Sequence, residues 1–232
     1  MLLKEIGAVS TILPFKTKFG GLSLDKHGLD VKDIISKESI FDQIDIEGYV
    51  VTNEKIKDSF FSRILSESAS VLGYKDIKSF FNHLKNVIRL NNNKKLIYGY
   101  WNRFDSIAHE HGVKSMQASH HFLRLNLELK SFLDDIKGTD TTVIITSDHG
   151  FIDSTEKKNF KLKDYTNLRE FLTLPPCGDS RVIYFYVHPS KEDKFVDYWE
   201  NELSEYSYLF RSEKIMERNY FGLYEINPNL LD

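Results

Sequence analysis

Three short runs of apolar and β-branched residues, each ending in a polar turn, stand out along the chain. They cover residues 96–101, 143–146 and 182–187, and the second ends directly at Ser147-Asp148-His149-Gly150. Continuous apolar runs of this length are typical of strands that are buried on both faces of a parallel sheet. We therefore predict that the three segments are strands of one largely parallel sheet.

Longer segments with apolar residues at helical spacing predict the helices. Residues 115–136 have such a pattern and are followed by Gly138, a typical helix stop. Residues 60–88 have it too, with a break near Gly73 and with Asp76 or Ser79 as the cap of the second piece. Residues 191–210 predict an amphipathic helix, whose apolar stripe we interpret as core and not as a base-stacking platform: Phe195, Tyr198, Trp199 and Leu203.

The order of these elements predicts an α/β fold. The helix at residues 115–136 is long enough to form a right-handed crossover, which would make the strands on either side of it parallel. We expect a mostly parallel sheet with helices on both faces, in a single α/β domain over residues 1–232 that is part of a longer catalytic domain.

An acid and a histidine follow each of the first two predicted strands. Asp148 and His149 come directly after residues 143–146, while Asp105 and His109, one helical turn apart, follow residues 96–101. The carboxyl ends of parallel strands form the edge where α/β proteins bind ligands. Two other interpretations stay open: Asp148 caps a turn beside an exposed His149, and Asp105 forms a surface ion pair with His109.

The two pairs together indicate a metal site. Carboxylate oxygen and imidazole nitrogen are ligands for divalent metals such as zinc. Two such pairs at one cleft are what a two-metal phosphoryl-transfer site requires, because the metals stabilise the attacking and leaving oxygens.

Four segments resemble the type I phosphodiesterase/nucleotide pyrophosphatase family of the alkaline phosphatase superfamily. The segments "YWNRFDSIAHEHG" and "ITSDHGFID" are similar to its two metal-binding motifs. Residues 172–189, "LTLPPCGDSRVIYFYVHP", and residues 3–15, "LKEIGAVSTILPF", are similar to flanking segments of its bacterial branch. The resemblance covers most of the chain.

The resemblance implies a hydrolase of phosphodiester or pyrophosphate bonds in nucleotides or related small molecules. It implies two divalent metal ions, zinc or alternatively manganese. Asp148 and His149 would hold the metal nearest the nucleophile, and Asp105 and His109 the metal that activates water. The family's Thr or Ser nucleophile, its first-strand Asp and a third His have no match here, so we expect a fragment that is inactive alone. The resemblance assigns no catalytic or substrate-binding residue.

Two other classes of function remain open at this stage. The chain could be a non-catalytic remnant or a binding subunit that retains the four metal ligands by descent. It could also belong to another branch of the superfamily, such as a phosphatase, a sulfatase or a mutase, since these share the metal pairs.

The composition of the chain indicates which partners to expect, but it says little about the chemistry of the site. The net charge of −3 over 232 residues gives no reason to expect a nucleic-acid polymer or an anionic membrane as a partner. The one cysteine, Cys177, excludes an internal disulfide and suits a reducing compartment, so we expect a cytoplasmic protein. No apolar run reaches membrane-spanning length.

Overall fold

The computed structural model describes residues 2–3, 7–11, 15–18, 20, 24–29, 38–153 and 161–223. The chain divides into two compact units, residues 1–153 and residues 154–232. The prediction of a single domain stays a prediction, because compactness within each unit does not decide it. Among the described residues, no helix is both long enough and apolar enough to span a membrane.

The centre of the first unit is a three-stranded parallel sheet. Strand β4 (Glu47–Asn53) lies between β5 (Ala69–Tyr74) and β6 (Lys95–Gly99), and it is parallel to both. The central segment of β4, Tyr49-Val50-Val51-Thr52, consists of β-branched and aromatic residues that favour strands, and its last three residues are buried. The strand predicted at residues 96–101 is confirmed in part as β6, which is parallel as expected but ends at Gly99, and its Tyr98 is exposed instead of buried.

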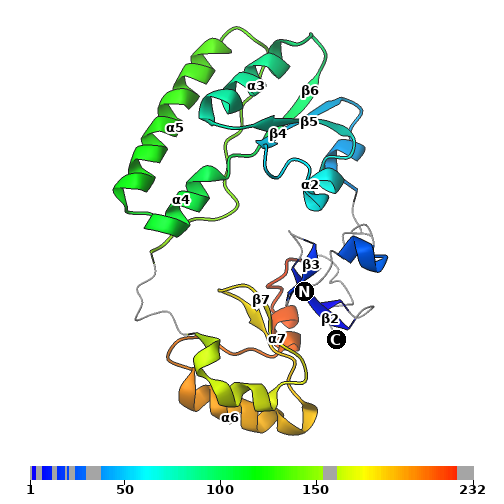
Figure 1. Ribbon diagram of the computed structural model, residues 1–232, viewed down its shortest axis with the longest axis vertical. Helices are drawn as coiled ribbons and strands as arrows, with labels where there is room; N and C mark the ends of the chain where they lie inside the picture. The colour runs from blue at the N-terminus through cyan, green and yellow to red at the C-terminus, as the bar shows by residue number, and fades with distance from the viewer. Residues whose placement is uncertain are drawn as a thin grey trace. The chain divides into compact units, whose positions relative to one another are not determined.

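Helices flank this sheet. Helix α3 (Ile77–Arg89) begins at the N-cap Asp76, as predicted, and packs against all three strands. Helix α5 (Met116–Asp135) matches the segment predicted at residues 115–136 and packs against α3 (Figure 1). The shared core contains Val51, Tyr74, Phe80, Phe81 and Phe132. The prediction of an α/β fold with a parallel sheet flanked by helices is therefore confirmed.

Shorter elements complete the first unit. Strands β1 (Leu2–Leu3), β2 (Ala8–Thr11) and β3 (Lys16–Thr17) form a small antiparallel sheet. Leu3, Phe15 and Leu24 form a core against helix α2 (Phe60–Leu65), where the rings of Phe15 and Phe60 stack at 4.4 Å. The remaining elements are the 3-10 helices η2 (Leu24–His27) and η3 (Ile40–Asp42) and the helix α4 (Arg103–His111).

Two predictions for the first unit are wrong. Residues 143–146 are not a buried strand: Ile144 is 84% exposed and Ile145 is 68% exposed. A strand needs a neighbour for its backbone groups, and residues 142–150 form no ladder with any residue that the structure describes. Residues 69–74 are not helical either, because they pair along β4 as strand β5, and Gly73 lies inside that strand.

The second unit contains a hairpin and helices. Strands β7 (Cys177–Gly178) and β8 (Ile183–Tyr184) pair in antiparallel orientation across a turn in which Asp179 accepts hydrogen bonds from the N–H groups of Arg181 and Val182. The prediction that residues 182–187 form a buried parallel strand is therefore wrong. A tight turn of this kind can join only antiparallel neighbours, since a parallel connection needs a crossover.

The predicted amphipathic helix of the second unit is confirmed as α6 (Glu192–Glu202). Phe195, Trp199 and Leu203 of its apolar stripe are buried, in a core that also contains Leu168. The other elements are helix α7 (Ser212–Glu217) and the 3-10 helices η5 (Leu162–Asp164), η6 (Thr166–Phe171) and η7 (Pro189–Lys191).

Candidate metal centre

The first acid–histidine pair lies on α4, just beyond the carboxyl end of β6. The side-chain oxygen of the N-cap residue Asn102 makes no capping bond, because it accepts a hydrogen bond of 3.1 Å from the hydroxyl of Tyr74 at the end of β5. The ring of Tyr74 also stacks on Trp101 at 4.9 Å. These contacts fix the start of α4 to the carboxyl edge of the sheet.

Asp105 and His109 are in direct contact along α4. The Nε2 atom of His109 lies 3.3 Å from Oδ1 of Asp105, which is close enough for an ion pair. However, that Oδ1 is shielded from solvent and accepts no hydrogen bond from any described residue. Two ligand atoms at about 2.0–2.1 Å from a tetrahedral zinc ion would lie about 3.3 Å apart. The spacing and the unused oxygen thus suit two ligands of one metal ion.

The second pair, Asp148 and His149, lies in an exposed segment without regular structure. The N–H of His149 donates to Oδ1 of Asp148 at 3.1 Å, and Nε2 of His149 lies 3.7 Å from Oδ2. The Nδ1 atom lies 2.9 Å from the carbonyl oxygen of Gly150. When Nδ1 carries the proton and donates to this carbonyl, Nε2 keeps a free lone pair, as in metal-binding histidines. The Gly150 carbonyl and then the charge of Asp148 raise the pKa of His149.

Two contacts connect the segments that carry the pairs. The ring of Phe151 lies edge-on to His149 at 5.1 Å and to Phe104, the neighbour of Asp105, at 5.5 Å. The carboxylate of Asp153 accepts hydrogen bonds from the backbone N–H of Val113 at 2.6 Å and of Lys114 at 3.3 Å. The segment after residue 147 therefore lies against α4 and the turn that follows it.

The charges of both carboxylates affect the pKa of Tyr100. Burial raises the pKa of its phenol, the negative charge of Asp148 raises it further, and Tyr98 and then Asp105 add smaller contributions. Asp105 also contributes to the raised pKa of His149. Both carboxylates thus act on one phenol, although the predicted common edge for the four ligands stays a prediction. Sequence reasoning assigned no role to Tyr100, Phe151 or Asp153, because nothing in a single sequence indicates such contacts.

The remaining histidines near this region have other partners. His121 on α5 accepts a hydrogen bond of 3.1 Å from Nε1 of Trp101, and the two rings stack. His111 lies 3.6 Å from the carboxylate of its neighbour Glu110.

The donor atoms fit a divalent metal in kind but only partly in number. Carboxylate oxygens and imidazole nitrogens suit zinc or manganese, and Oδ1 of Asp105 accepts no hydrogen bond from any described residue. Within the described part of the chain, however, no group of three His, Cys, Asp or Glu residues is arranged to hold a metal ion. Each pair thus supplies two donors. A structural zinc site normally has four protein ligands, and a catalytic zinc site has three protein ligands plus a water molecule.

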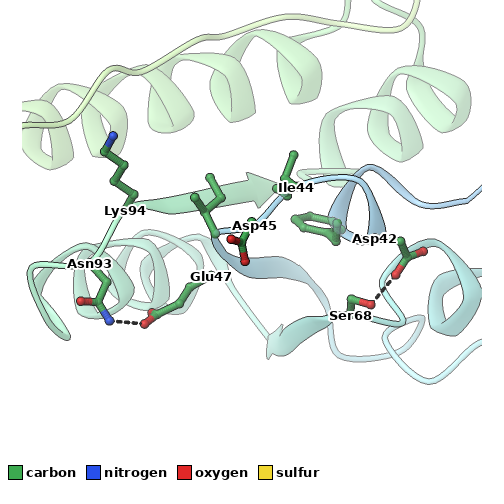
Figure 2. Close-up of a pocket in the computed structure, with 9 residues that line it drawn as sticks. Asp42, Ile44, Asp45, Glu47, Ser68, Asn93 and Lys94 are labelled. Atoms are coloured by element: carbon green, nitrogen blue, oxygen red, sulfur yellow. Dashed lines mark hydrogen bonds between the residues drawn. The ribbon is translucent and has the colours of Figure 1, made fainter.

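A pocket at the opposite edge of the sheet does not compete with this site. Its lining includes Glu47, Ser68 and Lys94, which lie at or just before the starts of the three parallel strands (Figure 2). Hydrogen bonds from Asn93 and Asn91 lower the pKa of Glu47, so that its carboxylate is already engaged. Ligands of parallel α/β sheets bind at the carboxyl edge instead.

Comparison with known proteins identifies the family. Neither the curated proteins nor the solved structures contain a significant match to this chain. The family model of type I phosphodiesterase / nucleotide pyrophosphatase, by contrast, matches residues 26–224, which include both acid–histidine pairs. The chain therefore belongs to the type I phosphodiesterase/nucleotide pyrophosphatase family of hydrolases.

Proposed function

We propose that Asp105, His109, Asp148 and His149 hold two divalent metal ions, zinc or manganese, for the hydrolysis of a phosphodiester or pyrophosphate bond. One observation carries the proposal: Phe151 contacts both His149 and Phe104, so the two segments that bear the ligands lie against each other. The family match supports the reaction class. The unused Oδ1 of Asp105 supports the metal.

Each residue would have a separate task in this reaction. The metal ions, when bound, would stabilise the charge on the attacking and leaving oxygens. Asp105 and His109 would bind through Oδ1 and Nε2. His149 would bind through Nε2, with Nδ1 held by the carbonyl of Gly150. The phenol of Tyr100, whose pKa is raised, stays protonated at neutral pH and can donate a hydrogen bond to a phosphoryl oxygen.

The aromatic residues beside the pairs favour a nucleotide as the substrate. The rings of Tyr98, on β6, and Tyr100, directly after that strand, have centroids 6.4 Å apart and planes 10° from parallel. Both rings are partly open to solvent, at 53% and 39% exposed. A nucleobase could stack on such a surface, because every base presents a π-face.

Metal titration tests the proposal. We expect the wild-type chain to bind zinc weakly, because each pair supplies only two protein donors. The double variant Asp148→Ala/His149→Ala should lose one of two bound ions, or more than about 90% of the affinity at that site. Zinc content is measured by elemental analysis after dialysis against a range of free zinc concentrations.

A matched control uses the same residue types outside the pairs. Asp140→Ala/His120→Ala removes an exposed carboxylate and an exposed imidazole from the same unit, so it should leave zinc binding unchanged. Equal zinc content in the wild type and in Asp148→Ala/His149→Ala would contradict the assignment of these ligands.

A further inference from the structure

Strand pairing in the sheet does not hold the second acid–histidine pair in place. Residues 142–150 have no ladder hydrogen bond to any described residue, and Ile144 and Ile145 are exposed. Asp148 and His149 therefore lack the register that a paired strand would impose on them. Some other contact has to hold them at a fixed distance from Asp105 and His109.

The carboxylate of Asp153 provides such a contact. Its Oδ1 accepts the N–H of Val113 at 2.6 Å and its Oδ2 accepts the N–H of Lys114 at 3.3 Å. These two amides follow Gly112, the residue that ends α4. Asp153 follows His149 by four residues, and Val113 follows His109 by four residues. The hydrogen bonds thus join the two segments at points that lie four residues after His149 and four residues after His109.

The turn after α4 is shaped to receive this carboxylate. Gly112 has a φ of +86° and a ψ of 148°, a conformation that is open almost only to glycine. A Cβ atom at this position would also lie 3.2 Å from Oδ1 of Asp153. The absence of a side chain therefore lets Asp153 approach the two amides.

A second contact also holds this segment against α4. Phe151, between His149 and Asp153, packs edge-on against both Phe104 and His149. The segment is thus held by a ring contact with Phe104 and by hydrogen bonds from the amides of Val113 and Lys114. Phe104 belongs to α4, and the two amides belong to the turn that follows it.

We propose that Asp153 is a positioning residue that sets the distance between the two acid–histidine pairs. It acts through His149 and Asp148, and it contacts neither metal nor substrate. The proposal rests on the proposed metal-binding function of the four ligands. It goes beyond that function because it explains how a segment without sheet pairing can keep two ligands in place.

Cobalt(II) binding, followed by visible absorption, tests the proposal in the full chain. Asp153→Ala removes both acceptors and should weaken cobalt binding about 10-fold or more, the usual effect of losing a residue that orients metal ligands. Asp153→Asn keeps one acceptor oxygen, so its affinity should fall between those of the wild type and Asp153→Ala.

Asp42→Ala is the matched control. The carboxylate of Asp42 also joins two segments, since it accepts a hydrogen bond from the N–H of Ser39. It accepts another from the hydroxyl of Ser68 (Figure 2). Asp42 lines the pocket at the opposite edge of the sheet. Its loss should lower stability without changing cobalt affinity.

A readout without metal separates this proposal from the metal assignment. In the metal-free chain, the nuclear Overhauser contact between the rings of Phe104 and Phe151 should be present in the wild type and Asp42→Ala, and lost in Asp153→Ala. Cobalt binding by Asp153→Ala that equals the wild type would overturn the positioning role. If the wild type binds no cobalt, the metal assignment is wrong, and the ring contact alone then decides: its persistence in Asp153→Ala would also overturn the role of Asp153.

Discussion

At the scale of single residues, His121 shows how one hydrogen bond fixes a protonation state. Its Nε2 accepts the indole N–H of Trp101, which requires an unprotonated nitrogen. Burial lowers the pKa of His121, and the positive charges of Arg103 and Arg124 lower it further. Protonation would therefore break the hydrogen bond between His121 on α5 and Trp101.

The lowered pKa predicts how stability depends on pH. Because the unfolded chain binds a proton at His121 more readily than the folded chain does, the free energy of unfolding should fall as the pH drops below about 6.5. His121→Gln keeps an acceptor for Trp101 but does not titrate. We expect this variant to show a smaller loss of stability between pH 7.5 and pH 5.5 in urea denaturation.

His120→Gln serves as the control, because His120 is exposed on the same helix. The charge of His120 is the smallest of the contributions that lower the pKa of His121, so this variant should keep most of the pH dependence of the wild type. An equal pH dependence in His121→Gln and the wild type would show that His121 does not contribute to it.

At the scale of elements, the sequence predicted helices better than strands. The helices α3, α5 and α6 were found from their apolar spacing, and Asp76 was recognised as a cap. Strand β4 was not predicted although Tyr49 to Thr52 favour a strand, and Gly48 lies inside it. Strand β5 was taken for a helix, since "ASVLGY" is too short for its period to be distinguished.

Only the ligands of the candidate site could be predicted from the sequence. Acid and histidine after a strand are visible in the sequence, and the motif around Asp105 does follow β6. The strand predicted before Asp148 is absent, because an apolar run becomes a strand only where a neighbour pairs with it. The contacts of Phe151 and Asp153 depend on tertiary packing, which no local pattern in the sequence indicates.

The contrast between β4 and residues 143–146 gives a stability prediction. Val51 is 0% exposed in the central strand, so Val51→Ala should lower the free energy of unfolding by about 2 kcal/mol through lost burial and a cavity. Ile144 is 84% exposed, so Ile144→Ala should change it by less than about 0.5 kcal/mol. Chemical denaturation measures both values. A loss of about 2 kcal/mol in Ile144→Ala as well would mean that this segment is a buried strand.

At the scale of the whole molecule, we predict very low activity for the 232-residue chain by itself. The covalent route of hydrolysis needs a hydroxyl in line with phosphorus and beside a metal. From the resemblance, we expect none of its serines or threonines to take the place of the family's nucleophile, including Ser147, the residue before Asp148. Turnover of a chromogenic phosphodiester should therefore not exceed that of free zinc.

The matching control for activity is Asp105→Asn/Asp148→Asn, which removes one charged ligand from each pair. The wild type and this variant should give the same low rate. Rapid turnover by the wild type that disappears in the variant would show that the chain contains its own nucleophile, and the prediction of inactivity would then be wrong.

The central claim is that the two acid–histidine pairs bind metal at one place. Anomalous diffraction at the zinc absorption edge, from crystals of the chain with zinc, tests this claim most directly. We predict two peaks, each about 2.0–2.1 Å from Nε2 of His109 or His149, and about 3.5–4 Å from one another. Zinc bound only to other residues, or two peaks more than about 10 Å apart, would contradict the shared two-metal site.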